Sequence, residues 1–135
     1  MPRIFDHIDL RVRDLAVAGE FYRRLLPLLG FSVKVEIEGW IQFEAAGRDA
    51  AEFFGVTEDK NHQPNRSRIA FWAESKARVD QLAAAARELG AGNIEGPDYE
   101  AESYYAVYFD DPSGNPLEIC HRSLRFNDEK PSRSS

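Results

Sequence analysis

Polar and apolar side chains alternate over residues 7–12, whose sequence is HIDLRV. A period of two is the pattern of a β-strand with one apolar and one polar face. The apolar face should pack beneath a helix. The polar face begins with His7 and should line whatever the other side of the sheet encloses.

A helix is expected directly after this strand. Asp14 has the side chain of an N-cap, and Gly30 has the conformational freedom that helix ends use. Pro27 should kink the helix or end it early, because proline has no backbone N–H. Between these limits, apolar residues recur three and four positions apart and predict one buried stripe, formed by Ala18, Phe21, Tyr22, Leu25, Leu28 and Leu29.

Three short strands complete the first half of the chain. Their apolar residues and flanking glycines predict strands at residues 31–38, 40–45 and 50–55. Residues 56–67 are polar, include a proline and have no periodicity, which predicts a connector. The first half therefore has the order βαβββ.

The second half repeats this plan. Residues 68–73 (RIAFWA) take the place of the first strand, Ser75 is the expected N-cap of a second helix, and Gly90 lies near its end. Three more strands are expected, at residues 93–94, 104–109 and 117–121. The last two should form a hairpin.

The repeated order predicts an α+β fold. It consists of two βαβββ modules, at about residues 3–55 and 67–122, within one domain over residues 1–122. Residues 123–135 are polar and are expected to form a disordered tail.

Composition narrows the classes of partner. The 135 residues include 17 Lys or Arg and 23 Asp or Glu, for a net charge of −6. This sign argues against a nucleic-acid partner, because such binding depends on neutralising phosphates.

No apolar run approaches the roughly 20 residues of a membrane span, and polar residues near the N-terminus argue against a signal peptide. Cys120 is the single cysteine, which excludes an internal disulfide and fits a cytoplasmic protein.

Glu118 is the main candidate for a functional carboxylate. It alternates with Leu117 and Ile119, so it should point away from the core face of its strand. A carboxylate on an interior strand is costly unless it is paired or bound to a metal. His7 lies on the matching face of its own strand. Considered alone, His7 is best explained as a polar residue with a structural role. When His7 is considered together with Glu118 and its motif, a location of both side chains in one cavity is favoured.

Aromatic residues gather on the predicted strands. Trp40, Trp72 and Tyr104 are the best candidates for contact with a ligand, and Trp72 shares strand parity with Arg68. Most other aromatic residues at such spacing are expected to be core.

The order of these motifs resembles the vicinal-oxygen-chelate superfamily of glyoxalases, bleomycin-resistance proteins and extradiol dioxygenases. The matching segments include HIDLRV at residues 7–12, Phe21-Tyr22, Leu29-Gly30-Phe31, Arg68-Ile69-Ala70-Phe71, Tyr104-Tyr105 and the terminal Asp111-Pro112-Ser113-Gly114-Asn115-Pro116-Leu117-Glu118. The resemblance implies that the two modules form an incomplete barrel around a central cavity.

The resemblance also implies a metal site. Metal-binding members place ligands on the first, fifth and eighth strands, with a further Glu on the fourth strand in glyoxalases. By position, the implied ligands are His7, Glu118 and Glu52, and the two glutamates are also the implied catalytic carboxylates. The metal would be a divalent ion such as zinc, nickel, manganese or iron. The fifth-strand position holds Arg68 instead of His, and a guanidinium stays charged and cannot ligate.

Arg68 leaves three alternatives open. It would pair with Glu118 or Glu52 in place of the metal, bind an anionic ligand, or extend from the strand end into solvent.

Two functions follow from the resemblance. In the first, the protein is a glyoxalase- or dioxygenase-like enzyme that acts on a small polar metabolite through a divalent metal, as a lyase, isomerase or extradiol-type dioxygenase. In the second, it is a metal-free small-molecule-binding protein of the resistance or sequestration type, with Arg68 replacing the metal. The resemblance also implies a homodimer. Neither nucleic acid nor a membrane is expected as a partner.

Overall fold

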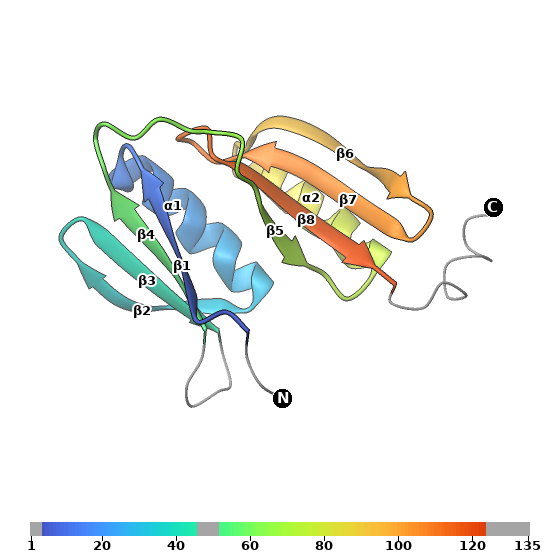
Figure 1. Cartoon of the computed structure of the whole chain (residues 1–135), viewed down its shortest axis with the longest axis horizontal. Coiled ribbons are helices and arrows are strands. Elements are labelled where there is room, and N and C mark those ends of the chain that lie inside the picture. The colour runs from blue at the N-terminus through green and yellow to red at the C-terminus, as the bar shows by residue number, and fades with distance from the viewer. Residues whose placement is uncertain (1–3, 46–51, 124–135) are drawn as a thin grey trace. The chain divides into compact units, whose positions relative to one another are not determined.

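The computed structural model of the chain describes residues 4–45 and 52–123. Over these residues the fold is α+β, and the chain divides into two units, Met1–Asn65 and Arg66–Ser135. Each unit holds one βαβββ module with a four-stranded sheet (Figure 1). The two modules predicted from the repeated pattern are confirmed. No helix among the described residues is long and apolar enough to cross a membrane.

Unit 1 has its strands in the order β1-β4-β3-β2. Its elements are β1 (His7–Val12), α1 (Leu15–Leu25), the 3₁₀ turn η1 (Leu26–Leu29), β2 (Phe31–Ile37), β3 (Trp40–Ala45) and β4 (Phe53–Glu58). β1 pairs with β4 in parallel, and the other pairs are antiparallel. The helix α1 lies against one face of this sheet (Figure 1).

The sequence explains where α1 begins and ends. The Asp14 carboxylate accepts hydrogen bonds from two backbone N–H groups of the first turn, at 3.0 and 3.4 Å, so the predicted N-cap is confirmed. The α-helix stops at Leu25, and the chain continues as a 3₁₀ turn that contains Pro27. Gly30 ends this turn with a φ of 102°, a left-handed conformation that glycine adopts without strain.

The predicted apolar stripe of the first helix is largely buried. Four of its members form the buried side of α1, namely Ala18, Phe21, Tyr22 and Leu25. The prediction is wrong for Leu28, which is 42% exposed. The 3₁₀ turn has fewer residues per turn than an α-helix, so the helical spacing no longer holds there.

Unit 2 has its strands in the order β5-β8-β7-β6. Its elements are β5 (Ile69–Trp72), α2 (Lys76–Glu88), β6 (Gly92–Ala101), β7 (Tyr104–Asp110) and β8 (Pro116–Arg122). β5 pairs with β8 in parallel, and β7 pairs antiparallel with both β6 and β8. Ser75 caps α2 as predicted, because its hydroxyl accepts from the backbone N–H of Arg78 at 3.0 Å.

Two strand predictions were wrong in extent. β4 runs to Glu58 and not to residue 55, because parallel pairing with β1 continues to that residue and buries Val56 completely. The connector therefore begins later than its polar composition suggested. β6 spans ten residues, although a strand was predicted only at residues 93–94. Its residues are mostly exposed and polar, so they carry little strand signal, and pairing with β7 stabilises the strand. The predictions for residues 50–51 and 124–135 lie outside the described residues.

Candidate functional site

β8 separates an apolar face from a polar one in unit 2. Leu117 and Ile119 are fully buried on the α2 side of the sheet. Glu118 and Cys120 alternate with them and lie on the opposite side, which we call the open face of unit 2. The register brings Tyr108 of β7 beside Glu118 on this face.

Glu118 is only 5% exposed and is engaged by Tyr104. The Tyr104 hydroxyl donates a hydrogen bond to the Glu118 carboxylate. Burial, and then this hydrogen bond, raise the pKa of Tyr104 far above its usual value. The phenol is therefore a protonated donor at physiological pH, and Glu118 is its acceptor.

Tyr108 and Cys120 extend this polar group. Burial is the largest cause that raises the pKa of Tyr108, while a hydrogen bond with Tyr104 acts in the opposite direction. Burial, and then the charge of Glu118, raise the pKa of the Cys120 thiol. A buried thiol with a raised pKa is a poor nucleophile, so the open face offers no activated thiolate. Its hydrogen-bonding groups include the Glu118 carboxylate and the Glu100 carboxylate, which hydrogen-bonds with Tyr108.

Arg68 lies at the entry to β5 and is exposed. Its Cζ lies 4.6 Å from the centroid of the Tyr108 ring, in a cation–π contact. Among the described residues of unit 2, no ion pair joins Arg68 to Glu118. Tyr104 is the hydrogen-bond partner of the carboxylate, so the Arg68–Glu118 pair considered from the sequence is not formed. Trp72, paired with Cys120, is 65% exposed.

His7 begins β1 in unit 1 and is exposed. Its Nδ1 lies 2.9 Å from Oδ2 of Asp6, and its ring stacks on Phe53 with 4.4 Å between centroids. Trp40 belongs to the same sheet, where its indole covers Gly55: a Cβ added at that glycine would lie 3.0 Å from the indole Nε1. The side of this sheet that carries His7 therefore also carries the aromatic rings of Phe53 and Trp40.

Glu52 lies immediately before β4. Its carbonyl accepts from the backbone N–H of Ala45 at 3.0 Å, and its Oε1 is buried. The β4 residue paired with His7 is Phe53, so strand alternation gives Glu52 the opposite parity. Sequence alone left this register open.

A metal ion in a protein needs several side-chain ligands that converge on one point. Within residues 4–45 and 52–123, no group of three His, Cys, Asp or Glu side chains is arranged to hold a metal ion. On the open face of unit 2, the Glu118 carboxylate already accepts from Tyr104, and the Glu100 carboxylate hydrogen-bonds with Tyr108. Arg68 at the β5 entry adds a positive charge and no ligand atom. The described residues of unit 2 alone therefore do not fit a metal centre.

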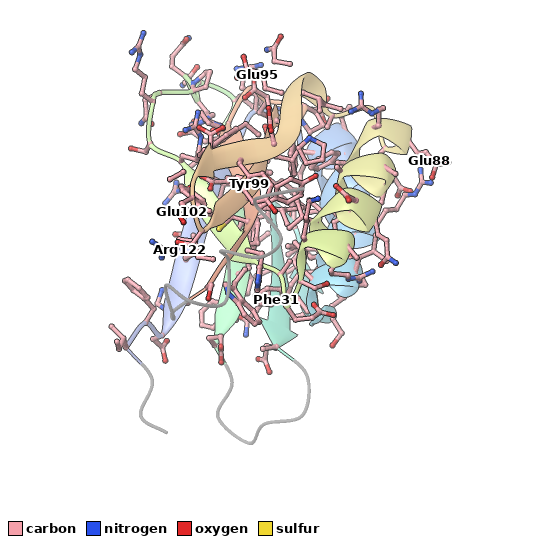
Figure 2. All side chains as sticks on the ribbon, turned by 90° about the vertical axis from the view of Figure 1, so that its right-hand side faces the viewer. Phe31, Glu88, Glu95, Tyr99, Glu102 and Arg122 are labelled. Atoms are coloured by element: carbon pink, nitrogen blue, oxygen red, sulfur yellow. The ribbon has the colours of Figure 1, made fainter. Side chains whose placement is uncertain are left out.

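Arg122 was missed by the sequence reasoning. It is the last residue of β8 (Figure 2), and its Cζ lies 5.7 Å from the centroid of the Tyr104 ring. The sequence did contain a signal for Arg122, because residues 118, 120 and 122 alternate onto the same face of a strand. The predicted strand ended at residue 121, so Arg122 was not placed on that face.

Comparisons with known proteins agree with this architecture. The sequence profile of the Glyoxalase/Bleomycin resistance protein/Dioxygenase superfamily matches residues 4–119. A glyoxalase/bleomycin resistance protein from Albidiferax ferrireducens T118 is 32% identical, with a TM-score of 0.73 over 90% of this chain and 100% of that one. No curated protein matches the sequence.

More distant structures share the fold. The fosfomycin resistance protein FosX from Listeria monocytogenes, solved with Mn(II) and sulfate, is 20% identical, with a TM-score of 0.70 and full coverage of both chains. A glyoxalase/bleomycin resistance protein/dioxygenase family enzyme from Burkholderia phytofirmans PsJN is 17% identical, with a TM-score of 0.70 over 87% of this chain and 98% of that one. The family resemblance of the sequence is thereby confirmed: the chain belongs to the Glyoxalase/Bleomycin resistance protein/Dioxygenase superfamily.

Proposed function

We propose that this protein binds a small polar molecule on the open face of unit 2, without depending on a metal ion. The observation that carries the proposal is the nearly buried Glu118 carboxylate, held by the Tyr104 hydroxyl on a strand face that also carries an exposed guanidinium. A buried carboxylate next to a neutral donor is a costly arrangement for a surface without a function.

The side chains suggest a division of roles. Glu118 would accept a hydrogen bond from the ligand or serve as the base that removes a proton, and Tyr104, whose single O–H donates to Glu118, would hold that carboxylate in place and accept from the ligand. Arg68 would take the place of the metal charge by binding an anionic or strongly polar group. Trp72 is exposed on the same face and would cover the ligand with its ring.

Ligand binding tests this proposal. A library of small polar metabolites is screened by thermal shift, and hits are measured by calorimetry. Tyr104→Phe and Glu118→Gln should each abolish or strongly weaken binding. Tyr99→Phe is the matched control, because Tyr99 of β6 (labelled in Figure 2) packs edge-on against Tyr105, which alternates with Tyr104 and so faces the other side of the sheet. Hits that bind all three variants equally would refute the assignment to this face.

A metal-dependent activity is the second candidate. The observation that favours it is that FosX from Listeria monocytogenes, which has the same fold, was solved with Mn(II). For this case the candidate ligands are His7 in unit 1 and Glu118 in unit 2, and Trp40 would lie beside the substrate. Glu52 has the opposite strand parity to His7 and is not proposed as a ligand beside it. A divalent ion of zinc, nickel, manganese or iron would then polarise oxygens of the substrate, as in lyase, isomerase or dioxygenase chemistry.

Metal content separates the two candidates. The tag-free protein is exposed to each ion, desalted and measured by elemental mass spectrometry. Near-stoichiometric metal that is lost in His7→Ala and Glu118→Ala, but kept in His62→Ala, would support the second candidate. No retained metal, together with ligand binding that withstands chelators, would support the first.

We also propose that the protein forms a homodimer in the cytoplasm. Light scattering on the purified protein checks the assembly, and a monomeric mass across the micromolar range would exclude it.

A further inference from the structure

Two guanidinium groups rest on the two tyrosine rings of the open face of unit 2. The Cζ of Arg68 lies 4.6 Å from the Tyr108 centroid, and the Cζ of Arg122 lies 5.7 Å from the Tyr104 centroid. Both arginines are exposed. Each ring therefore carries its own cation.

The strand register separates these cations along the sheet. Tyr104 pairs with Arg122 and Tyr108 pairs with Glu118, so the two tyrosines lie four residues apart on β7. At a rise of about 3.3 Å per residue, their backbones are about 13 Å apart. Arg68 precedes β5, whose first residue pairs with Leu117. The backbones of Arg68 and Arg122 thus lie toward opposite ends of the face, with Glu118 between them along the strands.

Both guanidiniums are prepared to bind anions. A guanidinium that stacks on an aromatic ring keeps its N–H edge free for a two-point contact with a carboxylate or phosphate. Among the described residues, neither Arg68 nor Arg122 forms an ion pair, and the carboxylate between them accepts from Tyr104. Stacking also limits the rotamers of these long side chains, which lowers the entropy that binding would cost.

We infer that the ligand of this face is an elongated molecule with two anionic groups, one bound by Arg68 and the other by Arg122. This inference rests on the proposed function, since it names the substrate class of the same site. The middle of the ligand would lie between the two stacked guanidiniums. A negative charge in the middle would meet Glu118, and Glu95 and Glu100 lie beside Tyr108, so each anionic group would have to sit on the N–H edge of its own guanidinium.

Calorimetry with a series of linear α,ω-dicarboxylates, from succinate to sebacate, tests the inference. Monocarboxylates of equal chain length are the comparison. One of the longer dicarboxylates should bind about tenfold or more tightly than its monocarboxylate, because a second charge-assisted contact is gained. Arg68→Gln and Arg122→Gln should each remove this preference. Arg87→Gln, on the exposed side of α2, should keep it.

Equal affinity for dicarboxylates and monocarboxylates, or no binding of either, overturns the inference. So does a preference that survives Arg122→Gln. These failures are distinct from failure of the proposed function. If neutral metabolites bind in a manner that requires Tyr104 while no dianion is preferred, only the inference is lost. If no small molecule binds in a manner that requires Tyr104, both are lost.

Discussion

The Tyr104 hydroxyl donates to Glu118, although Tyr104 pairs across the sheet with Arg122. Its side chain therefore leans along the strands and does not simply face its partner. This diagonal contact ties the end of β7 to the middle of β8. The nearly buried Glu118 carboxylate therefore depends on the Tyr104 phenol for a hydrogen-bond donor.

Replacing that phenol should destabilise the protein. Tyr104→Phe leaves the Glu118 carboxylate without its donor, at an expected cost of about 1–3 kcal/mol in the free energy of unfolding. Urea denaturation measures the change. Tyr104→Phe made in a Glu118→Gln background should cost less, since a neutral amide loses less from the missing donor. Equal costs in the two backgrounds would show that the contact contributes nothing to stability.

The raised pKa values of Tyr104 and Tyr105 predict loss of stability in alkali. Burial is the main cause for both, followed by hydrogen bonds to Glu118 and Asp80 respectively. A folded-state pKa above the unfolded value of 10.0 gives stability that is complete below pH 10 and declines as the pH rises further. Thermal unfolding between pH 8 and 11 checks this, and Tyr104→Phe should flatten the decline. A tyrosinate absorbance at pH 10 in the folded protein that disappears in Tyr104→Phe would contradict it.

Cys120 should resist thiol reagents. The thiol is buried, and its pKa is raised by burial and then by Glu118, so little thiolate forms at neutral pH. Labelling with a chromogenic disulfide at pH 7.5 should be slow in the native protein and fast in urea. Glu118→Gln removes a negative charge and should speed native labelling. Fast labelling of the native wild type would mean that this face opens readily.

Gly55→Ala should disturb Trp40. The new methyl group would lie 3.0 Å from the indole Nε1, closer than side chains normally approach, so the indole must move. We expect a loss of about 1 kcal/mol and a shift in tryptophan fluorescence. Gly92→Ala is the control, because its added Cβ would meet nothing closer than 3.8 Å. An unshifted emission spectrum in Gly55→Ala would mean that Trp40 does not rest there.

The modules and their helices were predictable because local rules determine them. Asp14 and Ser75 cap the helices as their side chains suggest, and Leu117 and Ile119 alternate with Glu118 on β8 as the pattern required. These features depend on residues close in sequence. The fold class could therefore be predicted before any pairing was known.

The extent of strands and the partners of side chains depend on distant residues. β4 continues to Glu58 because β1 pairs with it, and its polar last residues gave no sign of that partner. His7 stacks on Phe53, and Arg68 stacks on Tyr108, across strands whose register no local pattern encodes. The same holds for Tyr104 as the partner of Glu118.

β5 is a four-residue strand at the edge of its sheet, and among the strands that the structure describes its one sheet partner is β8. Arg68, immediately before β5, and Trp72, its last residue, are both exposed, whereas Phe71 between them is largely buried. Substitutions at the two outer positions would leave Phe71 and the Tyr104–Glu118 pair intact. Such an arrangement allows ligand preference to diverge between related genes at little cost to folding, and it makes these two positions the natural choice for a randomised library.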